Sequence, residues 1–119
     1  MKNFKELIIW QKGIEIIKKV YQLSKQFPSE EKFGLVSQIT RAAVSIAANI
    51  AEGSSRNSDK DYGRFLQIAL GSAFEVQTYL IIAKEMNLAN SQEIIELELL
   101  LENEIKMIHS FLKKLTALG

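Results

Sequence analysis

The sequence predicts an all-α fold: a single domain over residues 1–119 that forms an antiparallel, up-down-up-down four-helix bundle. Three observations lead to this prediction. Four segments repeat apolar residues every three or four positions, as helices with a buried face do. Each segment follows a short polar residue and has acids near its start, which is typical of a capped helix. The connections between them are short, so consecutive helices must run antiparallel.

The predicted helices span residues 4–26, 30–54, 58–87 and 91–117. Each is preceded by a side chain that can accept a hydrogen bond from a free backbone N–H of the first turn. These capping residues are Asn3, Ser29, Ser58 and Asn90. Gly53 is placed just after the second helix, where a left-handed residue often ends a helix.

Composition excludes several classes of site. The chain has no Cys, so disulfides, thiolate catalysis and Cys-ligated zinc are unavailable. The net charge is +1, far from the strongly basic balance of a dedicated nucleic-acid binder. The charged N-terminus lacks the apolar segment of a secretory signal, and no apolar run is expected to cross a bilayer. We therefore expect a cytoplasmic protein without membrane contact.

The apolar surface is wider than one bundle core requires. The first helix carries two apolar seams that together cover about half of its circumference, and the third and fourth helices are similarly broad. Large exposed apolar areas usually mark interfaces. This pattern predicts a homo-oligomer, the alternative being a monomer with a large core and scattered exposed apolar residues.

A polar stripe follows the second helix beside small residues, so its members are expected to be buried and to need partners. We expect it to lie against a polar and small-residue segment of the third helix, and Arg41 to pair with Glu75 or Glu52. The stripe could fix helix register or form a ligand or catalytic site. The set comprises Arg41, Ser45, Asn49, Glu52, Gly53, Gly71, Ser72 and Glu75. Gly71 and Ser72 are expected to allow close approach of the second helix.

The remaining candidate chemistry is sparse. His109 is the single histidine and has no partner in sequence that would make it a general base. Glu52, Asp61 and Glu75 fit a carboxylate metal site poorly, because bundle di-iron sites also need Glu-x-x-His pairs. We therefore expect no catalytic residue, no metal and no cofactor.

Six basic residues are candidates for phosphate contact: Lys12, Lys18, Lys19, Arg56, Lys60 and Arg64. The last three flank the start of the third helix, where backbone N–H groups also favour anions. The alternative is an ordinary solvated surface. Oligomerisation favours binding, because repeated copies of a weak basic patch gain from multivalency.

These patterns also carry a family resemblance. The chain resembles the 23S rRNA intervening-sequence proteins, also called the four-helix bundle protein family, from Trp10 to Leu115. The matching residues are Phe27-Pro28, Glu31, Phe33-Gly34-Leu35, Ser37-Gln38, Arg41-Ala42, Ser45-Ile46, Asn49-Ile50, Glu52-Gly53, Ala69, Gly71-Ser72 and Glu75. Ala47 and Ala48 replace a common Pro-Ala, which favours a straight helix.

The resemblance implies a bacterial cytoplasmic bundle that assembles as a ring, typically a homopentamer, and whose relatives are encoded within large-subunit rRNA genes. The chain is also similar to the basic, pentameric accessory protein of diversity-generating retroelements, which binds nucleic acid and a reverse transcriptase. We therefore predict a non-enzymatic homo-oligomer that binds RNA or DNA through a repeated basic surface. The alternative is a protein-interaction scaffold that makes no nucleic-acid contact.

Overall fold

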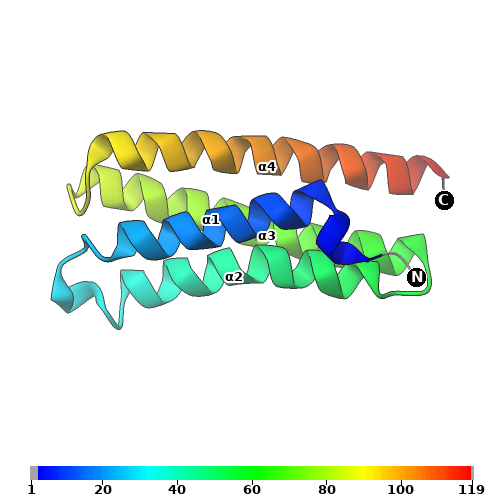
Figure 1. The fold of residues 1–119 in the computed structure, drawn as a ribbon, viewed down its shortest axis with the longest axis horizontal. Coiled ribbons are helices and arrows are strands. Elements are labelled where there is room, and N and C mark those ends of the chain that lie inside the picture. The colour runs from blue at the N-terminus through cyan, green and yellow to red at the C-terminus, as the bar shows by residue number, and fades with distance from the viewer. Residues whose placement is uncertain (1–2, 119) are drawn as a thin grey trace.

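A computed structural model describes residues 3–118 and confirms the all-α prediction. Four helices run alternately up and down in an elongated bundle of 45 × 22 × 20 Å (Figure 1). They are α1 (Ile8–Ser24), α2 (Leu35–Ser54), α3 (Asp59–Glu85) and α4 (Ser91–Leu118). Two short 3-10 turns, Phe4–Glu6 and Ser29–Glu31, precede α1 and α2.

The helices are arranged as a square in which each one packs against two others. Consecutive helices are neighbours, and α4 closes the square against α1. Within the described residues, the backbones of the diagonal pairs, α1 with α3 and α2 with α4, do not approach each other closely. The pair α2 and α3 has the most extensive contact, and the pair α1 and α4 the least. Residues on α1 and on α3 consequently lie on opposite sides of the bundle.

The core is a column of aliphatic side chains contributed by all four helices. Its largest fully buried apolar members are Ile16, Val20, Ile39, Ile46, Ile50, Leu66, Val76, Leu80, Ile94, Leu101 and Ile108. Alanines of α2 and α3 fill the space between them, which permits the close contact of these two helices. The apolar residues spaced every three or four positions therefore do form the buried faces that the sequence predicts.

The starts of the first two helices differ from the prediction. The Asn3 side chain accepts a hydrogen bond from the Lys5 backbone N–H, but it caps only a 3-10 turn, and extended Leu7 separates that turn from α1. Ser29 likewise begins a 3-10 turn without a side-chain capping bond, and α2 starts at Leu35. Gly34 separates this turn from α2, where its flexible backbone weakens helix propagation.

The caps of the last two helices are confirmed. The Ser58 hydroxyl accepts a hydrogen bond from the Asp61 N–H at 3.1 Å, and the Asn90 side chain accepts one from the Glu93 N–H at 3.0 Å. Between these two helices, Asn87 takes a left-handed conformation with φ of 54°. Asn tolerates this conformation better than most residues, so it can reverse the chain after α3.

Two predictions about glycines are wrong. Gly53 lies inside α2, and no described glycine has a positive φ, so Gly53 is not a left-handed terminator. A Cβ added at Gly53 would lie 2.9 Å from atoms of both Tyr62 and Phe65, so this glycine is the one that lets α2 approach α3 closely. Gly71 was expected to have that role, but it is exposed and a Cβ there would meet nothing within 4 Å.

Among the described helices, α3 alone is long and apolar enough to span a membrane by length and composition, with a mean hydropathy of 1.4 over 18 residues. Length and composition alone do not distinguish a membrane-spanning helix from a core helix, so the expectation that no segment crosses a bilayer stays a prediction. The helix packs against both α2 and α4, and its buried face accounts for much of its apolar composition. Such a composition is also found in core helices.

Candidate functional site

The polar stripe on α2 forms a short hydrogen-bonded chain that reaches α3. The buried Ser72 hydroxyl donates to the Ser45 hydroxyl at 2.8 Å, which links the two helices. The Asn49 side chain donates to the Ser45 hydroxyl at 2.9 Å and to the Ser45 carbonyl oxygen at 2.8 Å. These three residues are brought together as the sequence suggests, and they satisfy one another.

The charged members of the stripe lie outside this chain. Arg41, Glu52 and Glu75 are exposed, contrary to the expectation that the stripe would be buried. Arg41 and Glu75 line one shallow depression beside Ser45, but no ion pair within 4 Å joins Arg41 to either glutamate. The small residues of α2 face α3 and α1, while the charged positions turn to the outer edge of the same helix.

The six candidate phosphate contacts do not form one surface on a protomer. Lys12, Lys18 and Lys19 lie on α1. Arg56 lies in the connection between α2 and α3, and Lys60 and Arg64 lie in the first two turns of α3. Because α1 and α3 are diagonal, the two groups face different sides of the bundle.

Three of these six basic side chains form ion pairs with acidic neighbours. Arg56 pairs with Glu52 at 3.1 Å, and both side chains are about half exposed. Arg64 pairs with Asp61 at 3.6 Å, and Lys12 pairs with Glu15 at 3.6 Å. Within residues 3–118, Lys18, Lys19 and Lys60 form no ion pair. Exposed pairs of this kind hold their partners weakly, so phosphates can compete for the basic groups.

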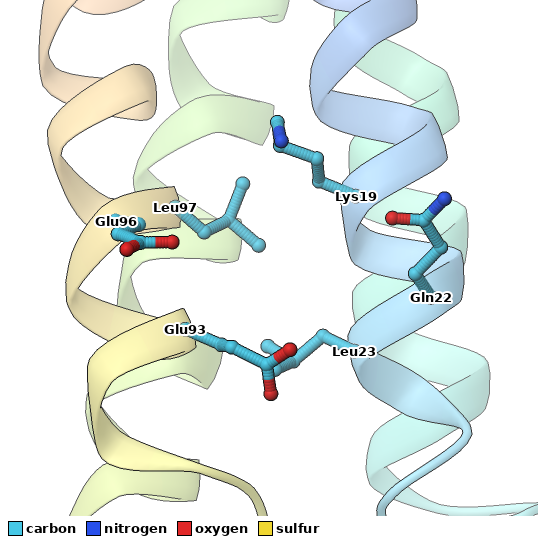
Figure 2. A pocket seen from close by; sticks show the side chains of 6 residues that line it. All are labelled: Lys19, Gln22, Leu23, Glu93, Glu96 and Leu97. Atoms are coloured by element: carbon cyan, nitrogen blue, oxygen red, sulfur yellow. The ribbon is translucent and has the colours of Figure 1, made fainter.

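A narrow groove lies between α1 and α4 (Figure 2). Lys19, Gln22 and Leu23 line it from α1, and three α4 residues, Glu93, Glu96 and Leu97, line it from the opposite side. Its volume is about 110 Å³, below the range of about 300–1,000 Å³ that small-molecule sites occupy. Two carboxylates facing one lysine make this groove unsuitable for phosphate.

A larger cavity of about 430 Å³ lies at the end of the bundle where α2 turns into α3. Four apolar or aromatic side chains line it, from the start of α1, the start of α3 and the end of α4: Leu7, Tyr62, Phe111 and Leu115. Polar residues of the connection complete the wall: Ser54, Ser55, Arg56, Asn57 and Asp59. The Tyr62 and Phe111 rings pack with their centroids 5.3 Å apart, and burial raises the pKa of the Tyr62 hydroxyl.

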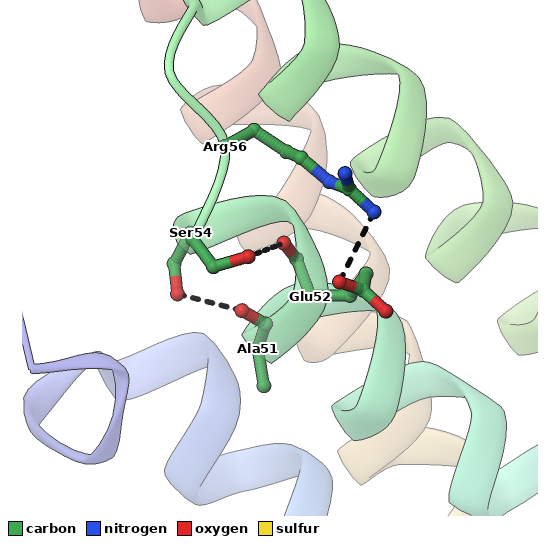
Figure 3. A network of polar contacts seen from close by, with 5 residues as sticks. Ala51, Glu52, Ser54 and Arg56 are labelled. Carbon is green, nitrogen blue, oxygen red and sulfur yellow. Dashed lines mark hydrogen bonds and ion pairs between the residues drawn. The ribbon is translucent and has the colours of Figure 1, made fainter.

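The polar wall of this cavity is ordered by local hydrogen bonds (Figure 3). The Ser54 hydroxyl donates to the Ala51 carbonyl at 2.8 Å, and the Ser55 hydroxyl donates to the Glu52 carbonyl at 2.7 Å. They occupy carbonyls that the end of α2 would otherwise leave free. The Arg56 guanidinium reaches back to Glu52 and lies 4.5 Å from the centre of the Phe65 ring.

Glu104 is an unusual residue of the core that the sequence reading overlooked. Its side chain is fully buried, and neither carboxylate oxygen has a hydrogen-bond partner in the part of the chain that the structure describes. Gly13 on α1 leaves room for it, since a Cβ there would lie 3.4 Å from a Glu104 oxygen and 3.2 Å from Ala47. Burial raises the pKa of Glu104 from 4.5 to about 8, and the positive charge of Lys12 opposes this rise.

The spacing of apolar residues along α4 indicates that Glu104 is buried. It follows Leu97 and Leu101 and precedes Ile108 by steps of three or four, so it occupies a position of the buried seam. A carboxylic acid in that register is unusual, because a buried carboxyl without a partner is costly when ionised.

Apolar side chains are exposed along the outside of the bundle, and α3 carries several of them. Ile68, Phe74 and Ile81 on α3 are each about half exposed, and Val44 on α2 is 41% exposed. We call these four residues the outer apolar set. Helix α3, which packs against both α2 and α4, thus also presents apolar side chains outward.

The titratable residues singled out in the sequence as catalytic or metal-binding candidates lie apart from one another in the structure. His109 is exposed on α4. Across residues 3–118, no three His, Asp or Glu side chains are grouped so that they could hold a metal ion, so Glu52, Asp61 and Glu75 do not form a cluster.

Residues 5–110 match the family described as 23S rRNA-intervening sequence protein, which covers most of the chain. The chain belongs to this family. The resemblance seen in the sequence is thereby confirmed. A search of curated proteins finds no match.

A solved structure supports the fold of this 23S rRNA-intervening sequence protein. It is the crystal structure of a protein with unknown function from the S23 ribosomal protein family of Bacteroides thetaiotaomicron VPI-5482. The two chains are 26% identical and superpose with a TM-score of 0.82, covering 89% of this chain and 99% of the other. The family and the fold are thus established, and neither description names a biochemical activity.

Proposed function

We propose that this family member is a non-enzymatic, cytoplasmic homo-oligomer, with a ring of five as the expected form, and that the assembly binds structured RNA. The outer apolar set is the observation that carries self-association. Ile68 and Phe74 lie on the same helix as Ile81 and are half exposed in the protomer, where they would contact water. Burial against a second copy removes apolar area from water at a gain of roughly 25 cal/mol per Å².

The basic residues support the second part of the proposal. Arg56, Lys60 and Arg64 gather at one end of the bundle, around the first turns of α3. A single protomer presents only a small patch, and two of these three side chains hold exposed acidic partners. Symmetric copies would repeat the patch, so that several weak phosphate contacts act together. The lysines of α1 would provide a separate contact on another side of the bundle.

A gel-shift titration with a structured RNA and a duplex DNA, repeated over a salt series, tests RNA binding. Binding through phosphates must weaken steeply as salt rises, because each neutralised phosphate releases counterions. Replacement of Lys60 and Arg64 by Gln should weaken binding and reduce the salt slope, whereas replacement of Lys25 and Lys32, which are exposed around the connection between α1 and α2 at the other end of the bundle, serves as a charge-matched control. Absence of binding at low salt would exclude this part of the proposal.

A protein-interaction scaffold is the second candidate, and the ion pairs favour it. Half of the six basic residues already pair with acids, and the net charge is +1. Under this alternative the outer apolar set contacts another protein. It predicts an oligomer of unchanged mass that binds neither RNA nor DNA at any salt concentration.

A further inference from the structure

The cavity of about 430 Å³ and one basic group occupy the same end of the bundle. The cavity wall includes Tyr62 at the start of α3, whereas Lys60 and Arg64, two residues before and after it, project from the opposite face of that helix. Arg56 belongs both to the cavity wall and to a second, shallower depression that it shares with Arg64. An aromatic cavity thus adjoins side chains that are suited to phosphate.

We propose that this cavity receives one unpaired nucleobase of a bound RNA while the adjacent basic side chains contact the phosphates that flank it. The inference rests on the proposed nucleic-acid binding and names the part of the RNA that is recognised. Proteins that recognise RNA by sequence typically take unpaired bases and stack them on aromatic side chains. Aromatic rings together with a cationic groove are also the usual components of single-strand binding.

The residues that line the cavity suit both the flat faces and the polar edge of a nucleobase. Tyr62 and Phe111 offer ring surfaces, and Leu7 and Leu115 offer aliphatic contact for a flat, weakly polar ring. At about 430 Å³ the cavity lies within the usual range for small-ligand sites. Unlike an apolar ligand, a nucleobase also needs hydrogen-bond partners along its edge.

Polar groups for that edge are present at the same wall. Among residues 3–118, the Tyr62 hydroxyl and the Asn57 amide make no side-chain hydrogen bond, so both are free to pair with a ligand. The Asp59 carboxylate can accept from an exocyclic amino group, as acidic side chains do with cytosine. Asp59 would repel a phosphate placed inside, which favours the base rather than the backbone as the occupant.

The test uses an RNA hairpin with a single bulged 2-aminopurine and a matched hairpin in which that position is paired. The wild-type protein should bind the bulged hairpin more tightly, and the probe fluorescence should change as the base stacks. Stacking contributes roughly 1–3 kcal/mol per base, so the expected preference is roughly 5- to 150-fold.

Two variants address the cavity by opposite changes. Tyr62→Leu removes an aromatic surface, and Leu115→Trp fills the cavity from the last turns of α4, where the side chain is only half buried. Both should abolish the preference for the bulge and leave the affinity for the paired hairpin unchanged. Tyr21→Leu, at an exposed position on α1, is the control and should retain the preference. Circular dichroism of each variant verifies that it is folded.

The outcomes separate this inference from the proposed function. Equal affinity for both hairpins with unchanged probe fluorescence would overturn the cavity assignment and leave RNA binding in place. A preference for the bulge that survives in both folded cavity variants would overturn it as well. If neither hairpin binds at low salt, RNA binding itself fails, and the cavity assignment fails with it.

Discussion

Glu104 shows how a single residue can set the response of this bundle to pH. Its carboxyl group is fully buried, and neither oxygen has a partner among the described residues. Ionisation in such surroundings is unfavourable, so burial raises the pKa from 4.5 to about 8, with Lys12 opposing the rise. Below about pH 8 the folded protein therefore holds Glu104 in its neutral form.

Replacement of Glu104 by Gln should flatten the dependence of stability on pH. Between about 4.5 and 8 the unfolded chain releases this proton while the folded protein retains it, so the free energy of unfolding falls as pH rises. The slope in this window is about 1.4 kcal/mol per pH unit. Urea denaturation of wild type and Glu104→Gln from pH 4 to 9 should show this fall in the wild type alone.

Glu102→Gln is the matched control, because Glu102 is exposed on the same helix. Its stability should follow the wild-type pH profile. A Glu104→Gln variant whose stability still fell between pH 4.5 and 8 as steeply as that of the wild type would contradict the assignment of a neutral, buried carboxyl.

At the level of secondary structure elements, one glycine and one hydrogen bond add to the alanine packing between α2 and α3. Gly53 permits the approach of Tyr62 and Phe65, and the Ser72 hydroxyl donates to Ser45 at 2.8 Å. Arg41, which also lies on α2, is exposed and forms no ion pair with any residue from 3 to 118. The small and neutral residues therefore register these helices, while the charged residue does not.

Gly53→Ala should destabilise the protein by about 1–3 kcal/mol, because a Cβ at 2.9 Å forces the helices apart. Gly71→Ala is the comparison on α3, where nothing lies within 4 Å of a new Cβ. It should not lower the unfolding free energy, since Ala favours a helix by about 1 kcal/mol over Gly. Urea denaturation measures both, and equal effects would contradict the close-approach role of Gly53.

A double-mutant cycle measures the bond between the two serines. Ser45→Ala and Ser72→Ala should each lower stability, and the double variant should lose less than the sum of the two. The expected coupling is about 0.5–1.5 kcal/mol, the net contribution of an ordinary hydrogen bond. Additive losses in thermal or urea denaturation would show that this bond does not couple α2 to α3.

At the scale of the whole molecule, the outer apolar set is about half exposed to water in the protomer. Half-exposed Ile68, Phe74 and Ile81 follow one helix, and the polar stripe of α2 lies beside it. Large exposed apolar areas usually mark interfaces, so we expect a second copy to cover these side chains. The charged residues at the edge of α2 would then lie close to that contact.

Serine at both Ile68 and Phe74 should shift the assembly to a 13.5 kDa protomer, measured by light scattering at micromolar concentration. The helical content should remain, because both side chains are about half exposed in the protomer. Phe33→Ser is the control, since Phe33 is 89% exposed in the connection between α1 and α2. A wild-type mass of one protomer would contradict self-association.

The sequence by itself determined the all-α class, the four helices and most of the core. These follow from local rules: apolar residues spaced every three or four positions and capping side chains act within one helix, so their effect is visible without neighbours. The family pattern was equally readable, from Trp10 to Leu115, and the family match over residues 5–110 confirms it. Helix starts were less predictable, because Leu7 and Gly34 interrupt segments that remain helical in pattern.

Only the tertiary structure decided which residues meet. It separated the basic residues of α1 from those of α3 by placing these helices on a diagonal, and it placed Gly53 rather than Gly71 at the close contact. It also buried Glu104 without a partner and formed a cavity from the ends of three helices and a connection. Each of these features depends on distances between distant segments, which helix rotation and packing set and which local spacing does not specify.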